Sequence, residues 1–207
     1  MVQKVQSENH SRQSRSDARR QCLLDTSRRL FAEQGFHQTG MSQIAKESGV
    51  AVGQIYRDFP NKEAIIVAIC ESSLEDWLQE RTLDRAIETG DRTAIRGWLA
   101  RLVTGENTFE ERRMLVEILA ESGRSPAIAR LNCEIIGRFR DLLERALASF
   151  VPRVSPTNRA LIVDLVLVLN WGLAAGQELD PGIDHAGFRS YAALLIQREI
   201  GSMLGEA

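Results

Sequence analysis

Polar side chains that suit DNA binding are grouped between residues 52 and 62. Gln54 and Arg57 carry donors able to read base edges in a major groove, and the phenol of Tyr56 can donate to a phosphate. Lys62 stands at the start of an expected helix, where free backbone N–H groups already favour an anion. These residue types predict base reading by the first pair and positioning on the phosphate backbone by the others.

Smaller residues complete the predicted DNA-binding surface. Val52 could contact a thymine methyl group, and Gly53 would let the backbone approach the DNA closely. Thr39 and Ser42 suit helix capping and phosphate contacts equally. The sequence therefore predicts the following DNA-binding residues: Thr39, Ser42, Val52, Gly53, Gln54, Tyr56, Arg57 and Lys62.

The elements that would position these residues have the spacing of a helix-turn-helix. Met41, Ile44 and Ala45 share one helical face, and helical spacing resumes from Val52. Gly49 between them can adopt a left-handed turn conformation. Two short helices joined in this way can cross steeply, so that residues 52–59 project as a recognition helix. Taken alone, this stretch also fits a helical hairpin buried in an all-α core.

The flanking sequence favours the DNA-binding interpretation. Residues 17–34 have helical spacing that Gly35 would end. Pro60 breaks the recognition helix, and Asn61 can cap a long helix that starts at Lys62 and reaches about residue 88. Three helices would therefore form a compact helix-turn-helix head over residues 17–61.

Three segments resemble the TetR family of one-component transcriptional repressors: L-F-A-E-Q-G-F-H-Q-T at 30–39, I-A-K-E-S-G-V at 44–50 and G-Q-I-Y-R-D-F-P-N-K-E-A-I at 53–65. The resemblance implies an operator-binding head and a helical body that binds a small molecule and forms a C2 homodimer. Such a dimer would set two recognition helices roughly one DNA turn apart, about 34–36 Å. Gly40 and Asp58 depart from the residues that the family often has there, which weakens the case for phosphate contacts at both positions.

Charge is distributed unevenly along the chain. Residues 1–62 hold ten Lys and Arg against six Asp and Glu, whereas the remainder holds 16 against 22. The arginines of residues 1–20 predict a flexible basic arm over residues 1–16, which could neutralise phosphates or enter a minor groove. A solvated N-terminus without function is equally compatible with residues 1–11.

Beyond residue 62 the sequence reads as one helix after another, so the fold class is all-α with about nine helices. Gly90, Gly123 and the Ser125-Pro126 and Ser155-Pro156 pairs mark helix ends and starts. We expect residues 62–207 to form the effector-binding and dimerisation domain.

The last two expected helices are apolar on more than one side, which indicates burial against a second surface. Small residues between them allow close approach, so the pair suits a four-helix interface with its own copy; an ordinary core pair is the alternative. The expected dimer-interface residues are Leu165, Val168, Leu169, Gly172, Gly176, Tyr191 and Leu195.

Large apolar and amide side chains of the body fit a mostly apolar effector pocket with a few polar groups. The expected ligand-binding residues, each of which also fits plain core, are Trp98, Phe109, Met114, Phe139, Asn170 and Trp171. Asn170 and Asp164 are polar amid apolar neighbours, so one of them is expected to face the pocket or the dimer interface.

Other classes of protein receive little support. No phosphate-binding glycine loop, nucleophile elbow or metal-ligand spacing is found, and adjacent acids such as Glu110-Glu111 diverge around a helix. We expect no catalytic residues, no metal and no cofactor. Cys22, Cys70 and Cys133 predict buried thiols rather than disulfides. No apolar span of 18 residues and no signal peptide are recognised, which favours a cytoplasmic protein without a membrane partner.

The sequence thus predicts a homodimeric repressor that binds a palindromic double-stranded DNA operator and leaves it when a small hydrophobic or aromatic effector binds. Efflux or catabolic genes are the targets that the resemblance implies. A DNA-binding protein of the same fold that senses no ligand is the main alternative, and an all-α enzyme is a weaker one.

Overall fold

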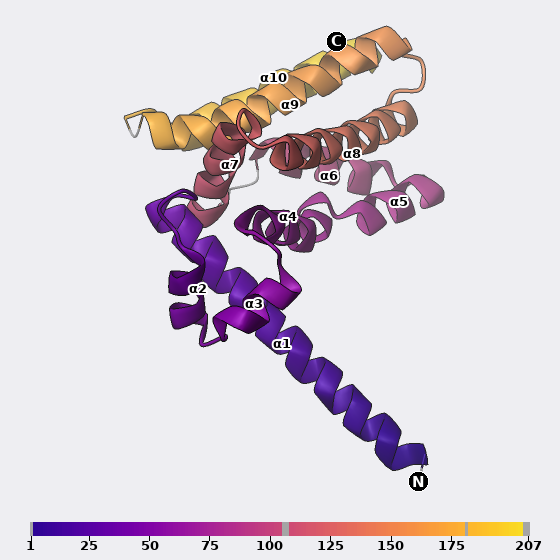
Figure 1. Ribbon diagram of the computed structural model, residues 1–207. Helices are drawn as coiled ribbons and strands as arrows, with labels where there is room; N and C mark the ends of the chain where they lie inside the picture. Colours follow the sequence, from indigo (N-terminus) through magenta and orange to yellow (C-terminus); the bar gives the residue numbers. More distant parts are fainter. Residues whose placement is uncertain (1, 105–107, 181, 205–207) are drawn as a thin grey trace. The chain divides into compact units, whose positions relative to one another are not determined.

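The computed structural model describes residues 2–104, 108–180 and 182–204, and in these ranges the chain forms ten α-helices and no strand (Figure 1). The all-α prediction is confirmed, with ten helices in place of about nine. Their bounds are α1 Val2–Gln34, α2 Met41–Ser48, α3 Val52–Asp58, α4 Lys62–Leu78, α5 Glu80–Thr89, α6 Arg92–Thr104, α7 Phe109–Ser122, α8 Pro126–Phe150, α9 Pro156–Leu179 and α10 His185–Leu204.

The chain divides into two compact units. The head unit comprises Met1–Ser73 together with Phe109–Ile128, and the body unit comprises Leu74–Thr108 together with Ala129–Ala207. The division differs from the expected boundary at residue 62 because α7 packs on α1 and the first part of α4 packs with the head. Helices α4 and α8 each pass from one unit into the other.

Helix α1 is longer than expected. Residues 1–16 were expected to form a flexible arm, whereas α1 runs without interruption from Val2 to Gln34. The physical reason is local: no Gly or Pro precedes Gly35, and Gln, Lys and Arg are good helix formers. Gly35 then ends the helix with φ +86°, as predicted.

Most helix boundaries lie where the sequence places them. Gly49 and Gly90 adopt left-handed conformations with φ of +69° and +65°. Asn61 caps α4 by accepting the Ala64 N–H at 2.9 Å. Asp91 and Ser155 act in the same way at the starts of α6 and α9, accepting from the backbone N–H groups three residues further on.

One expected helix is broken. The helix from Lys62 was expected to reach about residue 88, but Gln79 adopts φ +48° and separates α4 from α5. The last carbonyl of a helix has no partner within the helix. Here the Leu78 carbonyl accepts the indole N–H of Trp98 at 2.7 Å, so a tertiary hydrogen bond satisfies the break.

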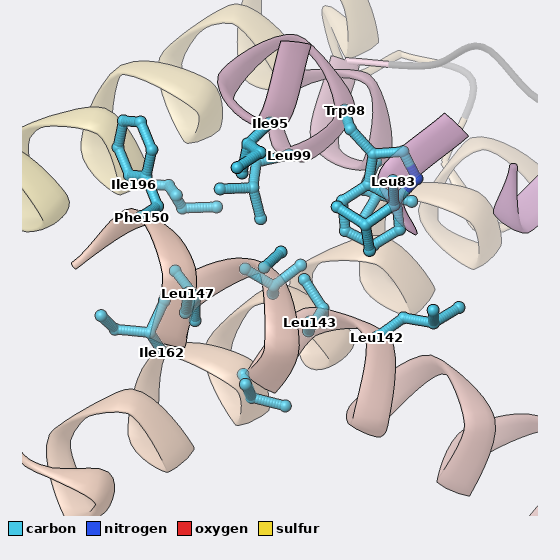
Figure 2. Packing of buried hydrophobic residues seen from close by; sticks show 14 of the residues in the cluster. Leu83, Ile95, Trp98, Leu99, Leu142, Leu143, Leu147, Phe150, Ile162 and Ile196 are labelled. Atoms are coloured by element: carbon cyan, nitrogen blue, oxygen red, sulfur yellow. The ribbon is translucent and has the colours of Figure 1, made fainter. Parts of the chain in front are cut away.

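Each unit has its own apolar interior. In the head, Leu30, Phe31, Ile44, Ile55 and Ile65 are fully buried. In the body, side chains of α5, α6, α8, α9 and α10 interdigitate, as Figure 2 shows for a set that includes Leu83, Leu99, Leu143, Leu147, Phe150 and Ile196. Burial of a single Leu, Ile or Phe side chain stabilises the fold by about 1.5–3 kcal/mol, so each cluster stabilises its own unit.

Helix α9 corrects the expectation that the chain has no long apolar span. By length and composition alone, Pro156–Leu179 could cross a membrane, although one third of its most apolar window is buried in the protein. One face of α9, which includes Ile162, Val163 and Val166, packs in the body core. Its apolarity is therefore explained in part by a soluble interior.

The three cysteines are not all buried, contrary to expectation. Cys22 and Cys133 are exposed thiols, and only Cys70 is withdrawn from solvent. Burial raises the pKa of the Cys70 thiol to about 12. Cys22 lies on the exposed side of α1, within 3.8 Å of the Ser48 carbonyl.

Candidate DNA-binding surface and dimer face

Helices α2 and α3 are fixed by buried residues and leave a polar surface outside. Ile44 of α2 and Ile55 of α3 are fully buried, so each helix can turn only one face outward. On α3 that face exposes Val52, Tyr56 and Arg57; Tyr56 is 52% exposed and Val52 is 38% exposed. An exposed tyrosine and arginine on a short helix after a tight turn have the geometry that entry into a major groove requires.

The polar side chains of α3 are bonded to one another in the free protein. The amide nitrogen of Gln54 donates to both carboxylate oxygens of Asp58, at 3.1 and 3.2 Å. Arg57 in turn donates to the amide oxygen of Gln54. Both predicted base-reading side chains are therefore held by a network that ends on the Asp58 carboxylate.

Thr39 is turned into the head, contrary to its prediction as a capping or phosphate-binding residue. Its side chain is fully buried, and its hydroxyl lies 2.9 Å from the Gly35 carbonyl and 3.3 Å from that of Leu30. The N-cap of α2 is Gly40 rather than Thr39. Ser42, by contrast, is exposed, as is Gly53.

Lys62 is also used inside the head. Its ammonium donates to the carbonyls of Phe36 at 2.7 Å and Thr39 at 2.8 Å, and it lies 4.4 Å from the centre of the Phe36 ring. Burial lowers the pKa of Lys62, partly offset by the nearby Glu63 and Glu121 carboxylates. The side chain predicted to contact a phosphate therefore ties the start of α4 to the α1–α2 loop.

Two carboxylates of α7 hold the same loop, and the sequence reading missed them. Glu117 accepts the backbone N–H of Phe36 at 2.8 Å, and Glu121 lies 2.7 Å from the His37 ring nitrogen. The Glu121 side chain is only 5% exposed. A signal was available, because both acids share a helical face with the buried residues Met114 and Ile118, where solvated acids would not be expected.

Helix α1 is joined to α2 by an ion pair of Arg29. Arg29 bonds Glu33 on its own helix at 3.1 Å and also bonds Glu47 on α2. The hydrogen bond from Arg29 lowers the pKa of Glu47, and burial acts against this shift. These groups are solvent-exposed, so the pair orients α2 more than it stabilises the head.

A second surface, on α9 and α10, is apolar and exposed. Val168 is 63% exposed and Tyr191 is 58% exposed, and α9 and α10 pack side by side within the body (Figure 1). Of the expected interface residues, Leu165, Val168, Gly172, Tyr191 and Leu195 are exposed, whereas Leu169 and Gly176 are half-buried. Further exposed apolar side chains on these two helices are Leu161, Leu179, Phe188 and Leu194. We call the exposed apolar residues of α9 and α10 the dimer face, after the interface that the sequence predicts there.

The expected ligand-binding residues do not gather in one unit. Trp98 and Phe139 are buried in the body core, and Met114 is buried in the head unit. Asn170 and Trp171 are half-buried on α9, and the side chain of Phe109 lies outside the described part. Both polar residues singled out earlier have partners: the Asn170 amide donates to the Leu102 carbonyl at 2.8 Å, and Asp164 pairs with Arg140 on the surface. Within the described ranges, no three His, Cys, Asp or Glu side chains are placed to bind a metal.

Comparison with known proteins agrees with this geometry. Residues 23–69 match the family model described as bacterial regulatory proteins, tetR family. The HTH-type transcriptional regulator AcrR of Shigella flexneri is 31% identical over 193 residues, covering 86% of this chain and 87% of AcrR. The regulator UidR of Escherichia coli K12 is 29% identical over 187 residues, covering 85% and 90%.

A solved structure shares the fold. The transcriptional regulator FadR from Bacillus subtilis, in complex with stearoyl-CoA, superposes with a TM-score of 0.65 at 18% identity, covering 85% of this chain and 96% of FadR. The family model covers the head, where the three resembling segments lie, and the relatives match over most of the chain, body included. The chain is a member of the TetR family of helix-turn-helix transcriptional regulators.

Proposed function

We propose that the protein is a ligand-responsive repressor that binds a palindromic operator as a homodimer. The observation that carries this proposal is the pairing of two exposed surfaces of opposite chemistry. One is the polar outer face of α3, and the other is the apolar dimer face of α9 and α10.

DNA contacts would come from a smaller set than the sequence suggested. Tyr56 and Ser42 are free to contact phosphates, while Gln54, Arg57, Val52 and Gly53 occupy the face that would enter the groove. Lys62 and Thr39 would act indirectly, by fixing the loop that precedes α2. In this proposal Lys62 positions the recognition helix rather than binding DNA.

A second copy of the chain is the occupant that best fits the dimer face. Soluble monomers seldom expose so many large apolar side chains on two neighbouring helices. A C2 pairing would cover the same residues on both copies at once. It would also double the number of recognition helices, which is what a palindromic operator requires.

Effector binding in the body would reach the head through α7. The chain passes from α6 of the body to α7, whose Glu117 and Glu121 bond the α1–α2 loop. An effector that favours one position of α7 would change how this loop, and with it α2 and α3, is held. Its effect is limited by the difference in its affinity for the two states.

The stearoyl-CoA complex of the similarly folded FadR supports a small molecule as the signal. A small hydrophobic or aromatic effector, control of an efflux or catabolic operon and a cytoplasmic location belong to the same proposal. The largely apolar body core is consistent with such an effector.

Selection from genomic DNA tests the proposal. Purified protein would be mixed with fragments of its source genome, and the enriched fragments would be assayed by fluorescence anisotropy at two salt concentrations. We expect salt-dependent binding to a palindromic site at least about a thousandfold tighter than to random DNA. Binding with no sequence preference would reject the repressor and leave a non-specific DNA-binding protein.

A further inference from the structure

Arg101, near the end of α6, is the one arginine of the described residues that has a buried donor without a partner. Its Nε is withdrawn from solvent and makes no hydrogen bond within the described ranges. One terminal nitrogen donates weakly to the Leu78 carbonyl, at 3.4 Å. The side chain as a whole is half-buried in the body unit.

Three other arginines of the body each pair with a carboxylate. Arg138 bonds Glu80, Arg145 bonds Asp84 and Arg159 bonds Glu144. No described carboxylate pairs with Arg101, and burial alone lowers its pKa. A guanidinium that loses water without gaining an anion destabilises the fold, so the described residues give no structural reason for a charge at Arg101.

The Leu78 carbonyl that Arg101 contacts is shared with an aromatic side chain. Trp98 lies one turn earlier on α6 and donates its indole N–H to the same Leu78 carbonyl, at 2.7 Å (Figure 2 labels this ring among the core side chains). Beside Leu78 in the chain, the Trp77 ring lies 4.9 Å from that of Phe139. The Leu78 carbonyl already accepts from two donors, so it cannot satisfy the remaining guanidinium N–H groups.

We propose that Arg101 binds an acidic group of the effector, so that the effector is an anion with an apolar body, such as a carboxylate on an aromatic ring or an alkyl chain. A guanidinium binds a carboxylate through two parallel hydrogen bonds, which fits a half-buried guanidinium whose Nε makes no hydrogen bond within the described ranges. The inference rests on the proposed sensing function and specifies its ligand class.

The test compares wild type with R101M, which keeps the length of the side chain and removes the charge. R96M is the matched control, because Arg96 is exposed on the same helix with its guanidinium over the Phe150 ring. Thermal unfolding would be measured with 2-naphthoate, octanoate and the corresponding primary amides as probes. The readout needs no DNA, so it is independent of the operator assay.

Three results are expected. Without ligand, R101M should melt at or above the wild-type temperature, because an uncompensated cation has been removed. At least one carboxylate should raise the wild-type and R96M melting temperatures by about 2 °C or more at saturation, while its amide does not. R101M should bind that carboxylate at least about tenfold more weakly.

The proposal is overturned if R101M melts several degrees below wild type without ligand, which would make Arg101 a structural residue. It is also overturned if amides act as well as carboxylates, if no carboxylate shifts the wild type, or if R101M responds like wild type. A carboxylate could raise the melting temperature in an Arg101-dependent way while the protein binds no specific DNA sequence. That result would reject the repressor function and support the anion site at Arg101. Specific DNA binding without any carboxylate effect would do the reverse.

Discussion

The outer face of α3 and the dimer face of α9 and α10 are both exposed, yet they are built from opposite residues. On α3 the exposed groups are the Tyr56 phenol, the Arg57 guanidinium and the Asp58 carboxylate, together with Gly53 and the apolar Val52. On the dimer face they are Leu, Val, Phe and Tyr. Water solvates the first surface well and the second poorly, so only the second is expected to be covered at all times.

The difference separates two kinds of recognition. A polar surface can bind and leave DNA under the control of salt and effector, because its groups are satisfied in both states. An apolar surface of this size is expected to stay covered by a partner, which the proposal takes to be a second copy of the chain. If this holds, changes on the dimer face should alter assembly first and DNA binding second, while changes on the head should alter DNA binding without altering assembly.

The largest effect is expected for Val168→Glu. A charge in the middle of the dimer face would be buried without a partner, so the homodimer should dissociate and operator affinity should fall at least about a hundredfold. Sedimentation velocity would measure the mass and anisotropy the affinity. Leu119→Glu is the control for assembly, since Leu119 is an exposed apolar residue of α7 outside this face. A dimer that survives Val168→Glu would break the comparison.

A smaller effect is expected for Lys62→Met. Loss of the ammonium leaves the Phe36 and Thr39 carbonyls without this donor, which should lower the melting temperature by about 2–6 °C and operator affinity about tenfold or more. Tyr56→Phe provides the contrast: it should weaken operator binding several-fold, by about 1 kcal/mol, without a change in melting temperature. If Lys62→Met were as stable as wild type, the internal role of Lys62 would be rejected, and the original prediction of a DNA contact would be favoured.

Glu117→Ala tests the contact of α7 with the head loop. Removal of the carboxylate leaves the Phe36 N–H without its acceptor, at a cost of about 1–3 kcal/mol in the free energy of unfolding. Glu117→Gln keeps an acceptor oxygen and should retain most of the stability. Urea denaturation of both variants would measure the difference, and two variants of equal stability would argue that the contact contributes nothing.

The smallest effect is expected for Asp58→Asn. This change removes a negative charge from the predicted DNA-binding surface and weakens the network that holds Gln54, so affinity for DNA should rise about two- to fivefold. The gain should shrink as salt is added. Anisotropy titrations at low and high salt would measure it, and reduced affinity would instead make Asp58 a reader of cytosine.

The sequence predicts those structural features that depend on residues close together in the chain. Helix ends at Gly35, Gly49, Gly90 and Asn61 depend on a residue and its immediate neighbours, and all were predicted correctly. The exposure of Tyr56 follows from the helical period that buries Ile55.

The features that were missed depend on contacts between distant segments. Thr39 and Lys62 have residue types that suit DNA, but the α1–α2 loop uses both of them internally. The break at Gln79 is stabilised by Trp98, whose indole N–H donates to the Leu78 carbonyl. Trp98 lies 20 residues beyond Leu78 in the chain. No local sequence pattern predicts which backbone carbonyl will accept a hydrogen bond from a residue far away in the chain.

The most direct test of the account is the number of chains on DNA. Native mass spectrometry of the protein alone, with the selected operator and with a single half-site would give both masses and relative affinities. We expect a dimer in the absence of DNA, an even number of chains on the palindrome and binding to a single half-site at least about a hundredfold weaker. A monomer in solution that binds one half-site as tightly as the full operator would contradict the role of the dimer face and with it the central claim.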